Sequence, residues 1–319
     1  MSERHSVICA EKERAPRLPS PANCIINFNK PKGITSHQAV EKIRRTLGVK
    51  KAGHAGTLDP LATGVLIICV GEGTKVARFL SDLDKEYVAV VKLGEKTNTF
   101  DSEGEVTEKR EGFSCAKEDI EKTLPGFLGA IKQVPPMFSA VKQGGTPLYK
   151  LARKGITVER TQRAVTVHEI GITRFSLPYF EMRVVCSKGT YIRSLCNDIG
   201  EALGMGAHMA GLTRTRTGVF RIEHAMNMSD LEQSAQCTGP EVSAGKGAIL
   251  SIDEALSHLR DISLTEREFR RAKNGLPSEY RNRSVVSEEY VRLKDPSGAL
   301  FAIGKMTPGA LRVERILHI

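Results

Sequence analysis

The sequence predicts an α/β protein of the α+β type, with one large domain of strands and helices and a small β-barrel at the end of the chain. Three observations support this fold class. The 319 residues are enough for one large domain and a smaller one. Short apolar runs typical of strands alternate with segments of helical periodicity up to about residue 220. Three strand-like segments then close the chain, at 290–294, 300–303 and 311–317.

Changes in composition predict the boundaries between these parts. Residues 1–22 are polar and contain three prolines, so we expect a mobile N-terminal tail. The stretch 223–246 is polar and contains Gly and Ser, which indicates a linker or an irregular connection. We therefore expect one domain over 23–250 and a second over 251–319.

The first predicted elements are a strand at 25–28 and a helix that begins after a turn. Thr35 and Gln38 fit a capping box, and Gly48 suits the end of the helix. The apolar residues between them fall on one helical face: Val40, Ile43 and Leu47. The cations in and just after the helix indicate either a solvated face or a phosphate-contacting face: Lys42, Arg44, Arg45, Lys50 and Lys51.

The segment 53–64, with the sequence GHAGTLDPLATG, precedes an apolar run at 65–70 that has the length and β-branched content of a buried strand. Its three glycines give the backbone unusual freedom, and Pro60 biases Asp59 away from helical dihedral angles. An ordinary Asp-Pro turn is the alternative. The density of special residues favours a loop that holds the Asp59 carboxylate in a fixed orientation.

Two later strands are predicted at 87–93 and 180–186, where apolar residues alternate with polar ones. The helix that follows the second of these strands carries Arg193 in its first turn, where the helix dipole disfavours a cation. We therefore expect an anion close to Arg193. A surface arginine, tolerated at a cost of a few tenths of a kcal/mol, is the alternative.

The stretch 132–163 is a long, basic and loop-rich insertion. Phe138 and Tyr149 lie among its cations, which suits phosphate contacts with occasional base stacking. The candidate RNA-contacting cations are Lys142, Lys150, Arg153 and Lys154, together with Lys30 near the start of the chain.

The charge of the chain favours a polyanionic partner. There are 47 Lys and Arg against 37 Asp and Glu, which gives a formal net charge of +10 and a pI of about 9.3. Nucleic acid is the first candidate, and a merely soluble basic protein is the alternative.

Cysteine usage and hydropathy exclude several other classes of protein. The seven cysteines are odd in number and form no C-x-x-C pair, which indicates neither a zinc site nor a disulfide framework but thiols in a reducing compartment. No run of about 18 apolar residues is present. We therefore expect a cytoplasmic protein with no membrane partner.

The remaining motifs exclude further kinds of chemistry. The stretch 71–75 lacks the Walker spacing of a nucleotide-hydrolysing loop. His54 and Asp59 have no further ligands at metal-site spacing. A glycosidase would need a second carboxylate, and spacing supports neither Asp101 nor Glu103 for that role. What remains is Asp59 as a nucleophile, with a pKa that a nearby arginine is expected to lower.

Four segments resemble the motifs of the TruB family of pseudouridine synthases, which convert a specific uridine of RNA to pseudouridine. The loop at 53–64 resembles the family signature. The segments 30–36 (KPKGITS), 85–94 (KEYVAVVKLG) and 187–195 (SKGTYIRSL) resemble the family's first, tyrosine and arginine motifs. Together these similarities extend over residues 25 to about 220 in the order of the family.

The resemblance implies a mixed, largely antiparallel sheet in a pseudouridine synthase catalytic domain, followed by a PUA-type β-barrel. The insertion at 132–163 corresponds in place to a family loop that clamps the T arm of tRNA. The insertion favours the bacterial, stand-alone enzyme that modifies uridine 55 of tRNA. The resemblance further implies a monomer with no cofactor, no metal and no obligatory protein partner. A tRNA-folding chaperone and a guide-RNA-dependent rRNA pseudouridine synthase subunit are the alternatives.

The resemblance also implies roles for individual residues. Asp59 is the expected nucleophile, Tyr87 stacks on the target base, and Arg193 pairs with Asp59. His54 is expected to help displace the flipped nucleotide in the T arm, and Tyr191 and Leu212 are expected to line the uridine pocket. The carboxylate attacks either C6 of the base or C1′ of the ribose, and both routes are compatible with the sequence.

Overall fold

The computed structural model describes residues 23–319 except 140, 237–246, 277 and 280–287. The predicted mobile tail at 1–22 lies outside the described residues, as does the second half of the predicted connection at 223–246. None of the helices in the described part of the chain is long and apolar enough to cross a membrane.

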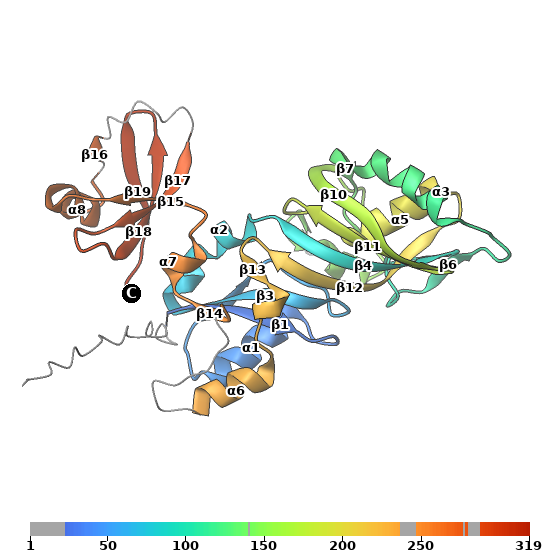
Figure 1. The fold of residues 1–319 in the computed structure, drawn as a ribbon, viewed down its shortest axis with the longest axis horizontal. Coiled ribbons are helices and arrows are strands. Elements are labelled where there is room, and N and C mark those ends of the chain that lie inside the picture. Colours follow the sequence, from blue (N-terminus) through green and yellow to red (C-terminus); the bar gives the residue numbers. More distant parts are fainter. Residues whose placement is uncertain (1–22, 140, 237–246, 277, 280–287) are drawn as a thin grey trace, which may run out of the picture.

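A ten-stranded sheet is the centre of the larger part of the molecule (Figure 1). The strands follow the order β14-β1-β3-β12-β4-β11-β10-β7, with β13 paired to β12 and β2 paired to β3. All these pairs are antiparallel except β3 with β12, so the expected mixed, mainly antiparallel sheet is confirmed. The strands span β1 Ile25–Lys30, β2 Ala52–Ala55, β3 Thr63–Val70, β4 Lys85–Leu93, β7 Gly129–Gln133, β10 Arg163–Ser176, β11 Tyr179–Cys186, β12 Ala207–Thr217, β13 Phe220–Arg221 and β14 Ile249–Leu250.

Helices and two small hairpins surround this sheet. The main hydrophobic core includes the apolar faces of α1 and α5, which pack on strands β1, β3, β4 and β12. The helical segments here are α1 Ser36–Thr46, η1 Gly71–Val76, α2 Ala77–Ser81, α3 Lys117–Thr123, η2 Leu124–Phe127, α4 Leu148–Ala152, α5 Ile192–Ala202, η3 Ile222–His224 and α6 Met228–Gln236. The hairpins are formed by β5 Glu95–Thr97 with β6 Val106–Lys109 and by β8 Lys142–Gln143 with β9 Thr146–Pro147.

The predicted elements before residue 220 are confirmed with small changes at their ends. Helix α1 begins after Thr35, whose hydroxyl accepts from the backbone N–H of Gln38 at 3.1 Å while the Gln38 side chain accepts from the Thr35 N–H at 2.8 Å. This is the capping box that the sequence predicts. Strand β3 is buried along seven of its eight residues, as its continuous apolar run indicates.

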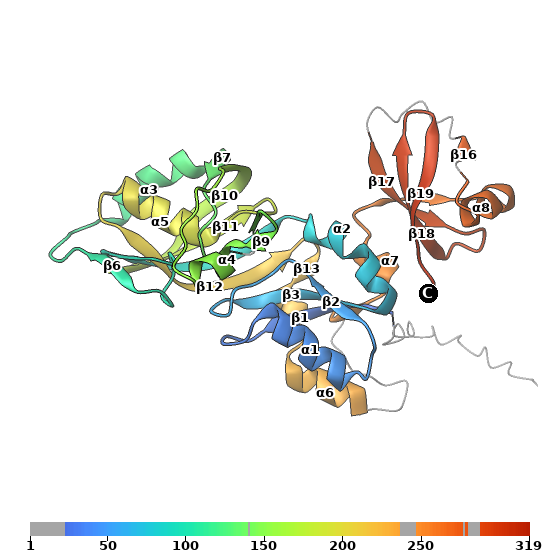
Figure 2. The same ribbon diagram turned by 180° about the vertical axis from the view of Figure 1, so that it is seen from behind.

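The prediction of an irregular connection at 223–246 is wrong for its first half, which contains α6. The side chain of Asn227 accepts from the Asp230 N–H at 3.0 Å, and the Asp230 carboxylate accepts from the Asn227 N–H at 2.8 Å. Helix α6 packs beside α1, as Figure 2 shows from behind. Leu231 of α6 is fully buried. A reciprocal cap and one apolar contact therefore form a helix in a segment whose composition is polar.

The C-terminal part of the chain forms a second, five-stranded sheet in the order β15-β17-β18-β19-β16. Its elements span β15 Arg260–Ser263, α8 Glu266–Lys273, β16 Ser278–Glu279, β17 Glu289–Lys294, β18 Leu300–Thr307 and β19 Ala310–Ile316. The three strand-like segments predicted near the end of the sequence are thus strands. Within the described residues no pairing closes β15 onto β16, so the expected barrel stays a prediction.

The two sheets adjoin through α2, the short helix α7 (Ile252–Ala255) and the last strands (Figure 1). Phe79 of α2 meets Tyr290 edge to face, with ring centroids 4.9 Å apart. Arg78 forms an ion pair with Glu314 at 2.8 Å, and the Arg78 guanidinium lies over both rings. Leu300 belongs to the same buried cluster as Phe79. The two parts therefore share an apolar core.

Candidate active site

The loop between β2 and β3 is fastened on both sides of Asp59. The Ser36 hydroxyl donates to the Leu58 carbonyl at 2.9 Å and accepts from the Leu58 N–H at 2.8 Å. The Gly33 N–H donates to the Pro60 carbonyl at 2.9 Å, and the Ala62 N–H donates to the carbonyl of Asp59 itself at 3.1 Å. These bonds hold the backbone at and around Asp59, while its side chain keeps 37% of its surface exposed.

Arg193 provides the charge partner of Asp59. It lies in the first turn of α5 with a side chain only 5% exposed, and its Nε is 3.0 Å from Asp59 Oδ2. The anion expected near this helix start is therefore present. The guanidinium also donates to two backbone carbonyls, those of Thr99 at 3.2 Å and Phe138 at 2.8 Å. Phe138 belongs to the basic insertion, so the insertion contacts the site directly.

Asp101 is a second carboxylate at the same guanidinium, a position that its spacing in the sequence does not indicate. Its Oδ2 lies 3.3 Å from Arg193 Nη1, and its side chain is almost fully buried. The Thr99 hydroxyl and the Glu103 N–H both donate to Asp101 Oδ1, at 2.7 and 3.1 Å. The residue before it, Phe100, has a φ of 63°, a conformation that costs about 1 kcal/mol or more in a residue other than glycine. The turn thus holds Asp101 against Arg193 at some cost in backbone strain.

These surroundings raise the pKa of Asp59, so the expectation of a lowered pKa is wrong. The largest cause is desolvation of the carboxylate by the protein around it, although 37% of the side-chain surface stays exposed. The negative charge of Asp101 adds to this effect. Arg193 and Lys30 act in the opposite direction but do not outweigh these two effects. Spacing gave no sign of Asp101, and the sequence analysis therefore counted only the arginine.

Tyr87 and His54 lie on strands next to this ion pair. Tyr87 of β4 is opposite Arg214 of β12, and burial raises the pKa of its phenol, an effect that the charge of Arg214 opposes and that of Asp59 adds to. His54 of β2 has a buried Nδ1 without a hydrogen-bond partner among the described residues. Burial and the positive charge of Arg214 lower the pKa of His54, so the ring is neutral near pH 7.

Comparisons with known proteins agree with this geometry. Residues 44–192 match the model of the TruB family pseudouridylate synthase N-terminal domain, and residues 193–257 match that of the tRNA pseudouridylate synthase B C-terminal domain. A protein of Pseudomonas paraeruginosa named tRNA pseudouridine synthase B is 42% identical, over 92% of this chain and 95% of its own length. The chain belongs to the TruB family.

Other relatives of this TruB family member support the assignment. A tRNA pseudouridine synthase B of Cupriavidus pinatubonensis is 42% identical, over 96% of this chain and 98% of its own. Among solved structures, a Cbf5-Nop10-Gar1 complex contains a chain that is 28% identical with a TM-score of 0.72, covering 93% of this chain and 85% of that one. An archaeal box H/ACA sRNP Nop10-Cbf5 complex gives 27% identity, a TM-score of 0.71 and coverage of 96% and 93%.

Tyr191 and Leu212, the other predicted pocket residues of this TruB family member, lie at the start of α5 and on β12. Tyr191 is the N-cap residue of α5, and Gln133 holds it in place: the Tyr191 N–H donates to the Gln133 side-chain oxygen at 3.0 Å, and the Gln133 amide donates to the Tyr191 carbonyl at 3.3 Å. Leu212 lies on β12 opposite Ala89 of β4, two residues along from Tyr87, and is half-buried. The fold thus places both on elements that carry Arg193 or adjoin Tyr87.

Lys30 requires a correction as a candidate RNA contact. Its side chain is completely buried at the end of β1, where the ammonium donates to the carbonyls of Pro31 at 2.9 Å, Ile34 at 2.7 Å and Pro60 at 3.4 Å. Burial lowers the pKa of Lys30 to about 8. Because no surface of the ammonium reaches solvent, Lys30 cannot contact RNA. It instead holds the Asp59 loop through its bond to the Pro60 carbonyl.

The candidate cations of the insertion, in contrast, are exposed. Lys142 lies on the β8–β9 hairpin, and Lys150, Arg153 and Lys154 lie in and after α4. Arg153 is stacked over the Tyr149 ring, 5.7 Å from its centroid. No carboxylate in the described part of the chain forms an ion pair with these four residues, so their charges are open to a polyanion.

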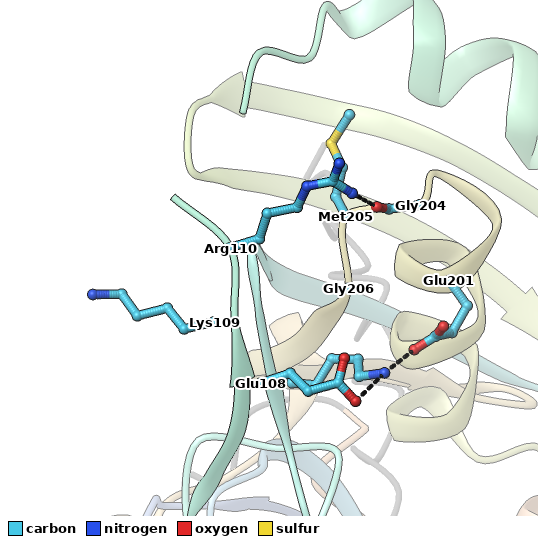
Figure 3. A pocket seen from close by; sticks show the side chains of 9 residues that line it. Glu108, Lys109, Arg110, Glu201, Gly204, Met205 and Gly206 are labelled. Carbon is cyan, nitrogen blue, oxygen red and sulfur yellow. Dashed lines mark hydrogen bonds and ion pairs between the residues drawn. The ribbon is translucent and has the colours of Figure 1, made fainter. Parts of the chain in front are cut away.

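A pocket of about 170 Å³ elsewhere in the molecule is lined by none of the predicted site residues. It lies between the β5–β6 hairpin and the end of α5 (Figure 3). The Lys96 ammonium lies between Glu108 and Glu201, at 2.7 and 2.9 Å, and Arg110 donates to the Gly204 carbonyl. These contacts fasten the hairpin to the helix. The described residues contain no group of three His, Cys, Asp or Glu that could hold a metal ion.

The acid side of the pH–rate profile provides a test of this charge arrangement. The rate of pseudouridine formation should fall at a higher pH than an ordinary aspartate would give, because the predicted nucleophile Asp59 has to react as a carboxylate and its pKa is raised. Asp101→Asn removes one cause of the increase, so its acid limb should lie at lower pH than that of the wild type. Single-turnover rates on unmodified tRNA between about pH 4.5 and 8 measure both limbs. An acid limb at the same pH in both proteins would contradict the electrostatic coupling.

Proposed function

We propose that this chain isomerises uridine 55, in the T arm of tRNA, to pseudouridine, with Asp59 as the nucleophile. The observation that carries the proposal is the ion pair of Asp59 and Arg193 in a loop fastened on both sides, in a chain of the TruB family. The names of the Pseudomonas and Cupriavidus relatives support tRNA as the substrate.

The substrate must enter this site as an extruded nucleotide. A uridine stacked in a folded RNA arm hides both C6 and C1′, and flipping it out costs a few kcal/mol of unstacking. The Tyr87 ring offers a stacking surface, and Tyr191 and Leu212 line the other walls of the pocket in this proposal. His54 is neutral, and in this proposal its partly exposed ring helps to displace the nucleotide from the T arm.

The reaction balances without any co-substrate. Asp59 attacks the flipped nucleotide through its carboxylate, and Arg193 holds the attacking oxygen in place and favours its ionised form. The bond between C1′ and N1 breaks, the base turns within the pocket, and a bond between C1′ and C5 forms. The bond between Asp59 and the nucleotide breaks again, which regenerates the free carboxylate. The proton on C5 is lost and N1 gains one, so substrate and product are isomers.

The basic insertion is the proposed clamp on the T arm. Lys142, Lys150, Arg153 and Lys154 are exposed and lack acidic partners among the described residues, which suits contacts with phosphate groups. The Phe138 carbonyl bonds to Arg193, so the clamp and the catalytic arginine belong to one network. Binding of RNA to the insertion and the position of Arg193 are linked through this bond.

We further infer that residues 23–250 form the catalytic domain and residues 251–319 a PUA-type RNA-binding domain. The second sheet supports this division, and so does α8, whose exposed cations include Arg267, Arg270 and Lys273. We propose that the protein acts as a monomer without a protein partner in the cytoplasm, where its proposed tRNA substrate is found. The complexes with Nop10 involve a related protein and not this chain.

The proposal predicts that the isolated chain modifies an unmodified tRNA transcript at one position, uridine 55, without added protein or guide RNA. Release of tritium from tRNA labelled at C5 of uridine measures turnover, and chemical mapping of pseudouridine gives the position. A transcript with cytidine at position 55 is the matched control and should release nothing. Modification only after a guide RNA and partner proteins are added would instead support the guide-dependent alternative.

A further inference from the structure

Arg214 is the largest fully buried side chain of the described residues, and the sequence analysis gave it no role. It lies on β12 at the centre of the large sheet, opposite Gly64 of β3 on one side and Tyr87 of β4 on the other. Only 1% of its surface is exposed. Its position connects the end of the Asp59 loop with the proposed stacking residue.

The guanidinium of Arg214 bonds to backbone carbonyls at both ends of the catalytic loop. Its Nη2 donates to the Gly56 carbonyl at 3.0 Å, and its Nη1 reaches the Thr57 carbonyl at 3.5 Å. On the other side of the loop, its Nε donates to the Val65 carbonyl at 2.6 Å. A single side chain therefore ties together the backbone before and after Asp59.

Two glycines make this arrangement possible. Gly64 has a φ of +97°, and a Cβ at this position would lie 2.2 Å from the backbone oxygen of Arg214, so only glycine permits the close pairing of β3 with β12. Gly56 has a φ of +89°, while a Cβ there would meet Arg214 Nη1 at 3.6 Å, an ordinary contact. Gly56 is thus required by its backbone conformation, which turns its carbonyl to the guanidinium.

Packing by itself would not require a charged side chain at position 214. Its hydrogen-bond acceptors are backbone carbonyls, and no carboxylate of the described residues forms an ion pair with it. A buried cation without an anion costs several kcal/mol, and an apolar residue of similar volume often fills such a place equally well. A side chain that serves only the core would therefore be expected to be apolar.

The charge does act on the groups of the site. After burial, the charge of Arg214 is the largest influence on the Tyr87 phenol, and it lowers the pKa of that phenol. It lowers the pKa of His54 as well, again after burial as the main cause. The charge of Arg214 thus acts on Tyr87 and His54, while its hydrogen bonds hold the backbone on both sides of Asp59.

We propose that Arg214 is a positioning residue for catalysis, which fixes the backbone on both sides of Asp59 and lies opposite Tyr87 on the neighbouring strand. The inference rests on the proposed pseudouridine synthase function. Arg214 does not touch the substrate, and it acts through the two residues that do. Since a misplacement of about 1 Å can reduce a rate by about 100-fold, a looser loop is sufficient to impair the reaction.

The test compares Arg214→Lys with Arg216→Lys in the full-length chain. Lysine keeps the positive charge, but its single ammonium cannot bond to all three carbonyls. Arg216 lies two residues further on the same strand, is partly exposed, and bonds to the Gly218 carbonyl and Glu86. We expect Arg214→Lys to reduce the single-turnover rate on unmodified tRNA by about 100-fold with tRNA affinity within about threefold of wild type, and Arg216→Lys to leave both nearly unchanged.

A chemical rescue separates positioning from a merely structural role. In Arg214→Ala, added ethylguanidinium should restore part of the rate, because it can occupy the vacated space and bond to the same carbonyls, while ethylammonium should restore less. A rate within threefold of wild type in Arg214→Lys would overturn the proposal, as would unfolding of both variants at the assay temperature. If the wild-type chain itself formed no pseudouridine in this assay, the proposed function would fail instead.

Discussion

Asp59→Asn is expected to abolish pseudouridine formation, with a rate at least about 10⁴-fold below that of the wild type. The amide is nearly the same size as the carboxylate and can still accept from Arg193, but it is not a nucleophile for this reaction. Binding of tRNA should stay within a few fold, since the change removes a negative charge from a surface that meets an anion. Tritium release and a filter-binding titration measure the two quantities.

Asp261→Asn is the matched control for this variant, because Asp261 is an exposed aspartate on β15 in the other sheet. It should retain full activity. Turnover by Asp59→Asn at a rate close to wild type would exclude Asp59 as the nucleophile. The same protein tests the chaperone alternative: tRNA refolding that persists in Asp59→Asn would show a separate folding activity, and refolding that is lost with catalysis would refute it.

Arg193→Lys is expected to reduce the single-turnover rate by about 10³-fold while tRNA affinity changes little. The guanidinium of Arg193 bridges Asp59 and Asp101 and donates to the carbonyls of Thr99 and Phe138. The ammonium of lysine is a compact group without the planar fork of a guanidinium, so it cannot form all four contacts. Asp59 would lose its fixed partner in a site where burial and Asp101 already disfavour its ionised form.

Arg183→Lys is the control for this substitution, since Arg183 pairs with Glu86 and Glu169 on the exposed side of β11. Its activity should equal that of the wild type. Rates measured at several pH values add a second check on Arg193→Lys, because loss of the guanidinium should move the acid limb to higher pH. A wild-type rate and acid limb in Arg193→Lys would contradict the role of the ion pair.

Local sequence signals were sufficient for the elements that carry the site. The capping box at Thr35, the apolar run of β3 and the alternation in β4 depend on neighbouring residues, and each formed where the sequence predicts it. The glycines and Pro60 around Asp59 are also local signals, and they indicated a fixed loop. The first half of segment 223–246 was misread because one asparagine cap and one buried leucine outweighed its polar composition.

The sequence by itself thus determined the Asp59 loop, the positions of the main strands along the chain and the pairing of Asp59 with an arginine implied by the family resemblance. Only the tertiary structure decided which charged residues are buried. Lys30 and Arg214 resemble surface cations in the sequence, and a bulge between Arg214 and Arg216 gives these alternating arginines different surroundings. Asp101 reaches Arg193 because its turn pairs with Met209 of β12, far along the chain. The physical reason is that burial and ion pairing depend on contacts between distant segments, which local periodicity does not contain.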